Sequence, residues 1–378
     1  MFRVITFLAV LTLLVFSQTA LAQGTFQETP LGDPLGTGMF VLYHDLDVGA
    51  DNMPVAVWSD GTTINAARWD GAAWQPLGDA VTSNGELFSK LAVGDDGTVI
   101  ITYLSTTDDG SSAELRASLF DGTAWTPLGD VINLYQSGTF NFDEAVAITP
   151  DGPVIAWREA QEFMQPDQLY VRLWDGSGWQ SVGGTESLST DASFEAGISD
   201  IAVLSDGSFA VAYDQSGTTS TRLWDGAAWQ TLPDLPGQEA EISFLRLDNA
   251  PDGSLILYRY YYGTLQDVHQ VAGGDPNWTS LSEALIAVGL DDSSYVDDAD
   301  LMVQDDGTVW LAWSYGGDGT AGLVKWDGTT WTAVSDPFTF MEQPTGYKAP
   351  VALGSDGSVY LARLNESLTL QVSQFAFN

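Results

Sequence analysis

A short unit, Trp-Asp-Gly-x-x-Trp, returns along this chain at nearly constant intervals, and this repeat limits the possible folds more than any other feature. Intact or nearly intact copies begin at Trp69, Phe120, Trp174, Trp224 and Trp326, and a degenerate copy spans 275–278. The aspartates of the six units stand at positions 70, 121, 175, 225, 275 and 327, so they are 50 to 54 residues apart. A period of this length is typical of chains that repeat one small unit of structure around an axis or along a stack.

A second marker, usually Asp-Gly, occurs once per repeat and brings the number of repeats to seven. It stands at 51–52 (as Asp-Asn), 96–97, 151–152, 206–207, 252–253, 306–307 and 356–357. Each copy separates two short apolar runs, for example 91–93 before the marker at Asp96, which is the pattern of a β-hairpin. A variable loop, a third strand, the tryptophan unit as a turn and a fourth strand complete the repeat. Four antiparallel strands per repeat make a propeller blade, so we predict an all-β fold, a seven-bladed β-propeller of four-stranded antiparallel blades.

The two ends of the chain predict how the ring closes. The seventh repeat runs from 351 to 378 and stops where its tryptophan unit should begin. Near the N-terminus, residues 26–33 (FQETPLGD) closely match residues 74–79 (WQPLGD), which form the fourth strand of the first repeat and its continuation. We therefore expect the N-terminal strand to complete the last blade and to remove the free edge of an open array.

The first residues have the pattern of a secretory signal. Arg3 is followed by an apolar run over 4–16 and by Ala-Leu-Ala at 20–22, before Gln23. The sequence thus predicts a signal peptide over 1–22, a single propeller domain over 23–378, and a secreted or periplasmic location. No later stretch approaches the roughly 20 apolar residues of a membrane span, so we expect no membrane insertion.

The composition narrows the partners and the chemistry. The chain has 51 acidic and 12 basic residues, which makes nucleic acid a poor partner. With 44% hydrophobic residues it can nevertheless fill a large core, so the charge belongs to the surface of a folded acidic protein. Such charge suits solubility in a salty or calcium-containing medium, or affinity for cationic partners. The chain has no cysteine, which excludes disulfides and thiol chemistry.

The tryptophan unit, followed by Leu-Gly at 77–78, resembles the repeats of secreted bacterial seven-bladed lectins. Its place at the turn between the third and fourth strands is similar to that of the Asp-box in sialidase-like propellers. The resemblance covers nearly the whole mature chain and, as a short pattern, implies a propeller fold rather than an activity.

Aromatic residues in the long loops are the candidates for a ligand-binding face. In a propeller, the loops between second and third strands and the connections between blades open on one common face, and exposed loops on a rigid scaffold commonly carry function. The candidate residues on this face are Tyr135, Phe140, Phe142, Tyr260, Tyr261, Tyr262, Tyr295, Phe338, Phe340 and Tyr347. The alternative is that these side chains fold back and pack on the propeller itself.

Acidic residues placed ahead of the first strand of several blades are the candidates for a metal site. Asp45, Glu144, Asp200 and Asp300 lie six or seven positions before their marker aspartates, and equivalent positions of different blades form a ring around the central channel. Clustered carboxylates repel one another unless they are neutralised, so calcium, a possible cofactor here, or trapped water is one hypothesis. Lys90 and Lys348 lie at or near the same ring and could neutralise the carboxylates instead.

The residues for catalysis are few. The chain has two histidines, His44 and His269, too few for a multi-histidine zinc site, and no Ser-His-Asp pattern stands out. The sequence therefore favours a non-enzymatic binding or scaffold module whose partner is a glycan or another extracellular protein. The alternative is a glycan-active enzyme, a glycoside hydrolase or lyase, that uses carboxylates at the channel mouth. The oligomeric state stays open.

Overall fold

The computed structural model describes residues 26–377 except for short internal stretches. These stretches are 38–39, 83–88, 107–112, 136–143, 161–165, 185–186, 190–195, 216, 238–241, 262–264, 273–274, 283–284, 286–289, 291–295, 335, 342 and 344–347. The proposed signal peptide at 1–22 lies outside the described residues. Within the part of the chain that is described, no helix is long and apolar enough to cross a membrane.

The regular secondary structure of the described chain is β-strand, apart from one 3-10 turn, η1 (Val182–Gly184). The strands of the first four blades are β2 (Tyr43–Val48), β3 (Pro54–Ser59), β4 (Thr63–Trp69), β5 (Trp74–Pro76), β6 (Val81–Thr82), β7 (Ser89–Val93), β8 (Val99–Thr106), β9 (Ala113–Phe120), β10 (Trp125–Pro127), β11 (Glu144–Thr149), β12 (Gly152–Glu159), β13 (Gln168–Trp174), β14 (Trp179–Ser181), β15 (Ala196–Val203), β16 (Phe209–Gln215), β17 (Thr218–Trp224), β18 (Trp229–Thr231) and β19 (Leu235–Pro236). Those of the last three are β20 (Ile242–Asn249), β21 (Leu255–Tyr261), β22 (Leu265–Val271), β23 (Thr279–Ser280), β24 (Asp298–Val303), β25 (Val309–Tyr315), β26 (Thr320–Trp326), β27 (Trp331–Ala333), β28 (Phe338–Thr339), β29 (Val351–Leu353), β30 (Val359–Leu364), β31 (Leu370–Phe377) and β1 (Phe26–Pro30).

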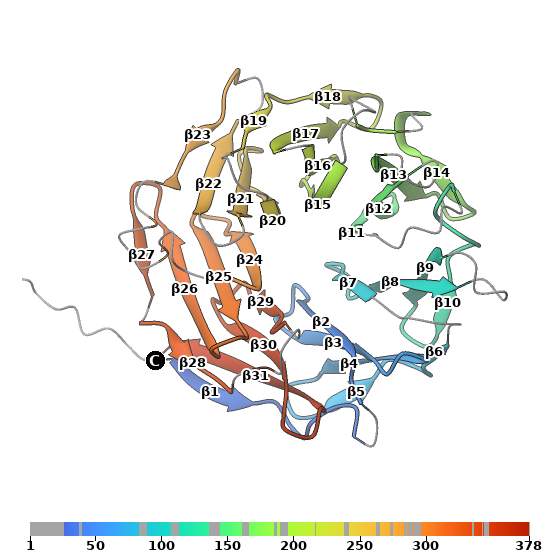
Figure 1. Ribbon diagram of the computed structural model, residues 1–378, viewed down its shortest axis with the longest axis vertical. Coiled ribbons are helices and arrows are strands. Elements are labelled where there is room, and N and C mark those ends of the chain that lie inside the picture. Colours follow the sequence, from blue (N-terminus) through green and yellow to red (C-terminus); the bar gives the residue numbers. More distant parts are fainter. Residues whose placement is uncertain are drawn as a thin grey trace, which may run out of the picture.

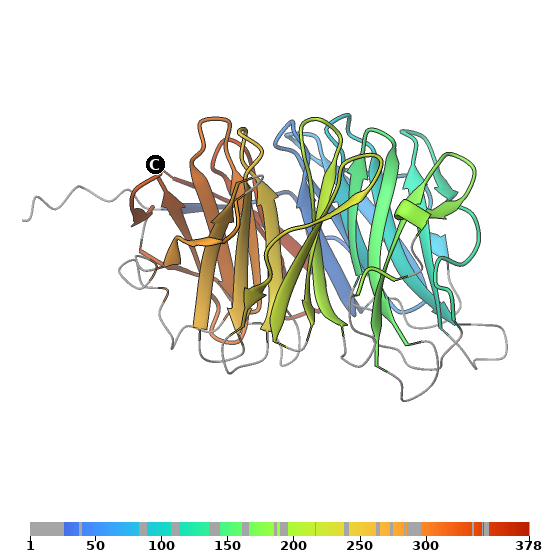
Figure 2. The ribbon, with the colours of Figure 1, turned by 90° about the horizontal axis from the view of Figure 1, so that it is seen from above.

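These strands form seven antiparallel sheets around a central axis, which confirms the predicted seven-bladed β-propeller (Figure 1). Six blades follow chain order from the centre outward: β2 to β5, β7 to β10, β11 to β14, β15 to β18, β20 to β23 and β24 to β27. In three of them β6, β19 or β28 pairs with the third strand as an additional short strand. Seen from the side, the strands run between the two faces of the ring and the connections lie at these faces (Figure 2).

The seventh blade joins the two ends of the chain. Its order is β29-β30-β31-β1, and β1 pairs antiparallel with β31 from Phe26 opposite Phe377 to Pro30 opposite Ser373. The Glu28 carboxylate forms an ion pair with Arg363 and accepts a hydrogen bond from the Ser373 hydroxyl at 2.8 Å. The N-terminal strand therefore completes the last blade, as its sequence match to the first repeat predicts.

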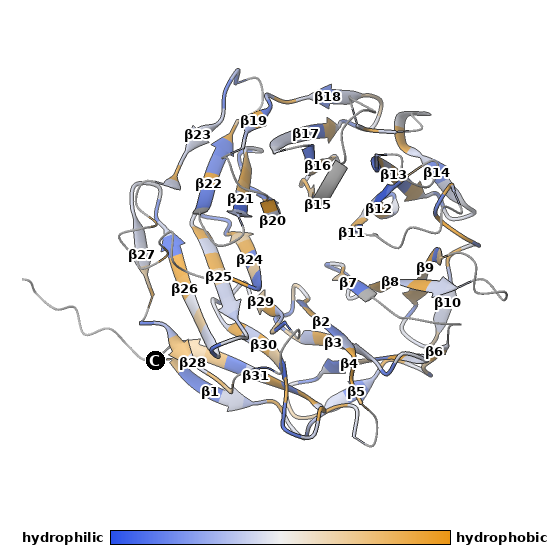
Figure 3. Cartoon of the chain, in the orientation of Figure 1, coloured by the Kyte–Doolittle hydropathy of each residue, from blue (hydrophilic) through white to orange (hydrophobic). Residues whose placement is uncertain are grey.

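The core lies between neighbouring blades, because each blade is covered on both faces. All six residues of β3 are buried. Val55 and Val57 belong to an apolar cluster shared with the second blade, whereas Ala56 and Trp58 belong to one shared with the seventh. This two-sided burial explains why second strands are nearly continuous apolar runs, while polar and apolar residues are mixed along third strands such as β26 (Figure 3).

The repeated tryptophan unit builds the outer turn of each blade. The Asp70 carboxylate accepts hydrogen bonds from the backbone N–H groups of Ala72 and Ala73 at 2.9 and 2.8 Å, which is an Asx-type turn. The second tryptophan, Trp74, packs edge-on against Trp69 and donates its indole N–H to the carbonyl of Leu31 in the neighbouring blade at 2.6 Å. The same indole bond to the preceding blade recurs at Trp125, Trp179, Trp229, Trp278 and Trp331. The unit thus closes a turn and joins two blades.

Candidate functional site

The predicted aromatic face is only partly described. Phe140, Phe142, Tyr262, Tyr295 and Tyr347 lie outside the described residues. Tyr260 and Tyr261 were expected on an exposed loop, but the structure places them inside β21 with exposed fractions of 2% and 0%. The run of tyrosines predicts the start of a loop, but β21 continues as far as Tyr261. Second strands are buried on both faces, so large aromatic residues can stand at successive positions there.

The other described aromatic candidates pack against the propeller. The backbone N–H of Tyr135 donates to the Glu159 carboxylate at 2.6 Å, and its ring lies 6.1 Å from that of Tyr170. Phe338 lies in β28, where its ring contacts Phe26 and Phe375, and Phe340 packs against the same apolar cluster. For these residues the structure agrees with the alternative of packing on the scaffold.

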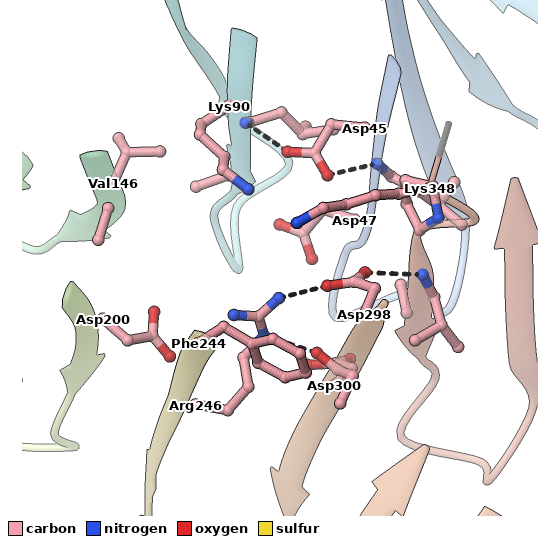
Figure 4. A pocket seen from close by; sticks show the side chains of 18 of the residues that line it. Asp45, Asp47, Lys90, Val146, Asp200, Phe244, Arg246, Asp298, Asp300 and Lys348 are labelled. Carbon is pink, nitrogen blue, oxygen red and sulfur yellow. Dashed lines mark hydrogen bonds and ion pairs between the residues drawn. The ribbon is translucent and has the colours of Figure 1, made fainter. Parts of the chain in front are cut away.

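A cavity of about 480 Å³ occupies the central channel and is lined by the innermost strands β2, β7, β11, β15, β20, β24 and the segment leading into β29. Asp45, Glu144, Asp200 and Asp300, the four predicted metal ligands, all line it, and so do Lys90 and Lys348. Figure 4 shows several of the charged side chains converging on its centre. Among the described residues, no group of three or more His, Asp or Glu side chains is arranged to hold a metal ion, so calcium at the channel stays a hypothesis.

The channel carboxylates join neighbouring blades. Asp45 accepts the backbone N–H of Leu91 at 3.3 Å and Asp47 that of Val93 at 2.8 Å, both from the next blade. The same forward hydrogen bond is made by Asp200 to Leu247, by Asp248 to Val303, by Asp298 to Val351 and by Asp300 to Leu353. The innermost strand of each blade is a sheet edge, so the N–H groups on its free side, which faces the channel, need an acceptor. The carboxylates supply that acceptor, and where both oxygens accept one N–H each, about half of the acceptor positions stay open.

Glu144 faces the other way. Its Oε1 accepts the hydroxyl of Thr102 in the preceding blade at 3.2 Å, and Glu144 is 4% exposed. The prediction treated Glu144 as the equivalent of Asp45, but in the third blade a two-residue turn joins Thr149 and Gly152. Elsewhere five residues separate the strands, as between Val93 and Val99. Despite this shorter turn, Ala145 stands six residues before Asp151, as Asp45 does before Asp51, and packs toward the fourth blade. Glu144 stands seven residues before its marker, and adjacent strand residues face opposite sides.

Arg246 anchors the opposite wall of the channel. Its Nη2 lies 2.5 Å from Oδ1 of Asp298, and its Nε donates to the carbonyl of Ala299 at 2.6 Å. The guanidinium also lies over the ring of Phe244 at 5.2 Å. These bonds fix Arg246 across the boundary between the fifth and sixth blades and use the charge of Asp298.

Burial changes the protonation of this cluster. Desolvation raises the pKa of Asp300 to about 8, and that of both Asp47 and Asp248 to about 6, although backbone hydrogen bonds to each act in the opposite direction. Desolvation also lowers the pKa of His44 to about 4, so its imidazole is neutral near pH 7. Asp300 therefore keeps its proton over much of the neutral range, and the channel is less negative than its residue count suggests.

Sequence reasoning missed Asp47, Asp298, Arg246 and Phe244, all of which line the cavity. A strand periodicity of two would have found Asp47 and Asp298, because they stand two residues from Asp45 and Asp300 and face the same side. The site that results combines carboxylates, three cationic side chains and an aromatic ring. Such a set can donate hydrogen bonds to one small polar ligand and accept hydrogen bonds from it.

Comparison with known proteins supports the fold and names no family. No family model matches the chain, and no curated protein matches its sequence. A protein of unknown function from Dyadobacter fermentans has a TM-score of 0.52 and 10% identity, and the match covers 94% of this chain and 99% of that one. AofleA from Arthrobotrys oligospora has a TM-score of 0.51 and 12% identity, with 84% and 90% covered. The SapL1 lectin in complex with α-methyl fucoside has a TM-score of 0.50 and 12% identity, with 78% and 96% covered. At these identities the likeness shows a shared β-propeller architecture.

Proposed function

We propose that this protein is a non-enzymatic carbohydrate-binding module that recognises a glycan at the face where the central channel opens. The observation that carries the proposal is the channel cavity. Its volume of about 480 Å³ lies within the roughly 300–1,000 Å³ of small-molecule sites. Its lining offers the hydrogen-bond donors and acceptors that saccharide hydroxyls require, beside the ring of Phe244.

One exposed apolar side chain of the cavity lining extends this surface. Leu42 lines the cavity and is 41% exposed, and Phe40, two residues earlier, is 69% exposed. The exposed apolar side chain of Leu42 at the polar cavity suits the apolar face of a sugar ring. The lectin SapL1 is one of the similar structures, and its complex with a fucoside supports a saccharide as the class of ligand.

The expected location agrees with this function. A signal peptide at 1–22 would deliver the acidic mature chain to the periplasm or the cell exterior, where glycans and surface proteins are the available partners. The resemblance of the tryptophan unit to bacterial lectin repeats points in the same direction. An extracellular protein partner is the other outcome that the binding experiment can reveal.

One observation favours the glycan-active alternative, namely the protonated Asp300. A carboxyl group that keeps its proton near neutral pH can act as a general acid, and Asp47 lines the same cavity. Against this reading, the carboxylates near Asp300 are held by backbone N–H groups of the next blade. If a bound glycan is cleaved, new reducing ends appear. Their release by this protein, and its loss in Asp300→Asn, would establish that the protein is a glycan-active enzyme.

The test is a glycan-array screen of residues 23–378, with and without added calcium. We expect selective binding that a free competing saccharide abolishes. Leu42→Ala should weaken binding several-fold, because it removes apolar surface at the cavity. Leu134→Ala is the matched control, since Leu134 is similarly exposed at 37% but does not line the cavity. A blank array in both conditions would overturn the proposal, and equal losses in the two variants would place the binding elsewhere on the face.

A further inference from the structure

The distribution of lysine in this chain is strongly uneven. The whole sequence has three lysines, Lys90, Lys325 and Lys348, among 51 acidic residues. Two of the three, Lys90 and Lys348, line the channel cavity together with Arg246. They come from the second and seventh blades, which flank the first blade and its Asp45 and Asp47. In Figure 4 both lysine side chains extend toward the centre of the cavity.

The two ammonium groups have unused donor capacity. Neither Lys90 nor Lys348 forms an ion pair within 4.0 Å or donates a side-chain hydrogen bond to any described residue, whereas Arg246 is fixed by Asp298 and Ala299. The charge of Asp45 lies near Lys90 and raises the pKa of its ammonium group, but the two side chains form no hydrogen bond. Both oxygens of Asp45 and both oxygens of Asp47 accept backbone N–H groups. The two ammonium groups carry six N–H donors, and among the described residues none of them is engaged in a side-chain hydrogen bond.

The backbone around Lys348 is held in place. The imidazole of His44 hydrogen-bonds to the backbone of Lys348, which joins the first blade to the seventh. His44 is neutral because burial lowers its pKa to about 4, so it adds no charge of its own. The backbone of the lysine is thus positioned by a neutral group, and the charge of Lys348 acts on the neighbouring Asp297 without an ion pair within 4.0 Å.

We propose that the cavity binds an acidic saccharide, a sugar residue that carries one carboxylate, with that carboxylate between the ammonium groups of Lys90 and Lys348. A chain of net charge −39 repels anions in general, so a site for an anion has to gather the few cations that the chain has. The ring hydroxyls would face the carbonyls, the protonated Asp300 and the aromatic ring that also line the cavity. This proposal rests on the saccharide-binding function above and specifies its ligand class.

The test compares acidic glycans with their neutral parents on one array. The probes are oligosaccharides ending in glucuronate, galacturonate, mannuronate or sialic acid, each beside the same glycan with its carboxylate methyl-esterified. We expect binding to at least one acidic member and at least tenfold weaker binding to its ester. The double variant Lys90→Gln/Lys348→Gln should lose this preference. Lys325→Gln removes the same charge from an outer position over Trp310 and should keep it.

The outcomes separate this inference from the function on which it rests. Binding of neutral and acidic members with equal affinity, unchanged in the lysine variants, overturns the acidic-sugar proposal and leaves carbohydrate binding intact. No binding by any member overturns both. If Lys90→Gln fails to fold because Asp45 loses its neighbouring charge, Lys348→Gln alone carries the test, since that side chain is exposed and has no ion-pair partner in the described part of the chain. Lys348→Arg should retain the preference.

Discussion

Two adjacent glycines after the third blade allow the inter-blade packing of the tryptophan unit to be measured. Gly183 and Gly184 both have φ of +68°, a left-handed conformation that is strained for any other residue. A Cβ on Gly183 would lie 2.9 Å from ring atoms of Trp224 and Trp229 in the next blade. A Cβ on Gly184 would meet nothing within 4 Å. The two positions therefore share the backbone strain and differ in the steric contact.

The expected magnitudes follow from this difference. Gly184→Ala should cost only the left-handed strain, about 1–2 kcal/mol. Gly183→Ala should add an overpacking cost of roughly 1–3 kcal/mol, because two tryptophan rings must move and one of them, Trp229, donates its indole N–H to the carbonyl of Val182. Gly183→Ala is thus predicted to be the more destabilising variant by about 1–3 kcal/mol.

The assay is urea denaturation of the mature chain, followed by tryptophan fluorescence and far-ultraviolet circular dichroism in parallel. Coincident transitions by the two probes are needed before a free energy is extracted for a protein of this size. Equal losses in the two variants would refute the reasoning, because they would show that the tryptophan rings give way without cost. A larger loss in Gly184→Ala would refute it as well.

The remaining predictions concern the channel. The pKa of Asp300 is raised to about 8 in the folded state, so near pH 7 the folded chain holds a proton that the unfolded chain releases. The stabilisation that this proton contributes is lost as the pH rises. The free energy of unfolding should therefore increase by about 1–2 kcal/mol from pH 8 to pH 6.5, and by less in Asp300→Asn. Arg246→Met should cost roughly 2–4 kcal/mol by urea denaturation, since it leaves Asp298 unpaired, whereas Arg68→Met, whose partner Asp51 is half exposed, should cost under about 1 kcal/mol. A chelator should leave the melting temperature unchanged, because the channel carboxylates have backbone partners; a clear decrease would support the calcium hypothesis.

The sequence predicts the fold well because the fold repeats. One turn chemistry, seen in Asp70 and its equivalents, and one inter-blade bond, seen in Trp74 and its equivalents, recur often enough to be read from spacing alone. The closure of the ring by β1 was also predictable, because residues 26–33 match a fourth strand whose place is known. These features are local or periodic, and both kinds are visible in a linear sequence.

The candidate site was only half predictable. The acidic ring, Lys90 and Lys348 could be placed near the channel by counting from the markers. The hydrogen bonds of the carboxylates to the next blade could not, because residues such as Asp45 and Leu91 are far apart in sequence. The side chain of Glu144 faces the preceding blade because it stands seven residues before its marker, whereas Asp45, Asp200 and Asp300 stand six before theirs. The burial of Tyr260 and Tyr261 depended on where a strand ends, which a run of tyrosines does not reveal.

The channel is also the place where the repeat breaks its own symmetry. Three residues before the end of the innermost strand, six of the blades carry Asp45, Lys90, Asp200, Arg246, Asp300 and Pro350. The outer tryptophan unit keeps nearly the same residues around the ring, because every blade needs the same turn and the same inter-blade bond. A purely structural role at the channel would be met by aspartate in every blade, since each innermost strand presents the same N–H groups. Lysine and arginine at two of these positions cannot accept those hydrogen bonds. Arg246 instead joins the fifth and sixth blades through Asp298 and Ala299, so a structural role explains its charge. Lys90 has no such bond to any described residue, and its charge is the part of this asymmetry that the proposed acidic ligand would use.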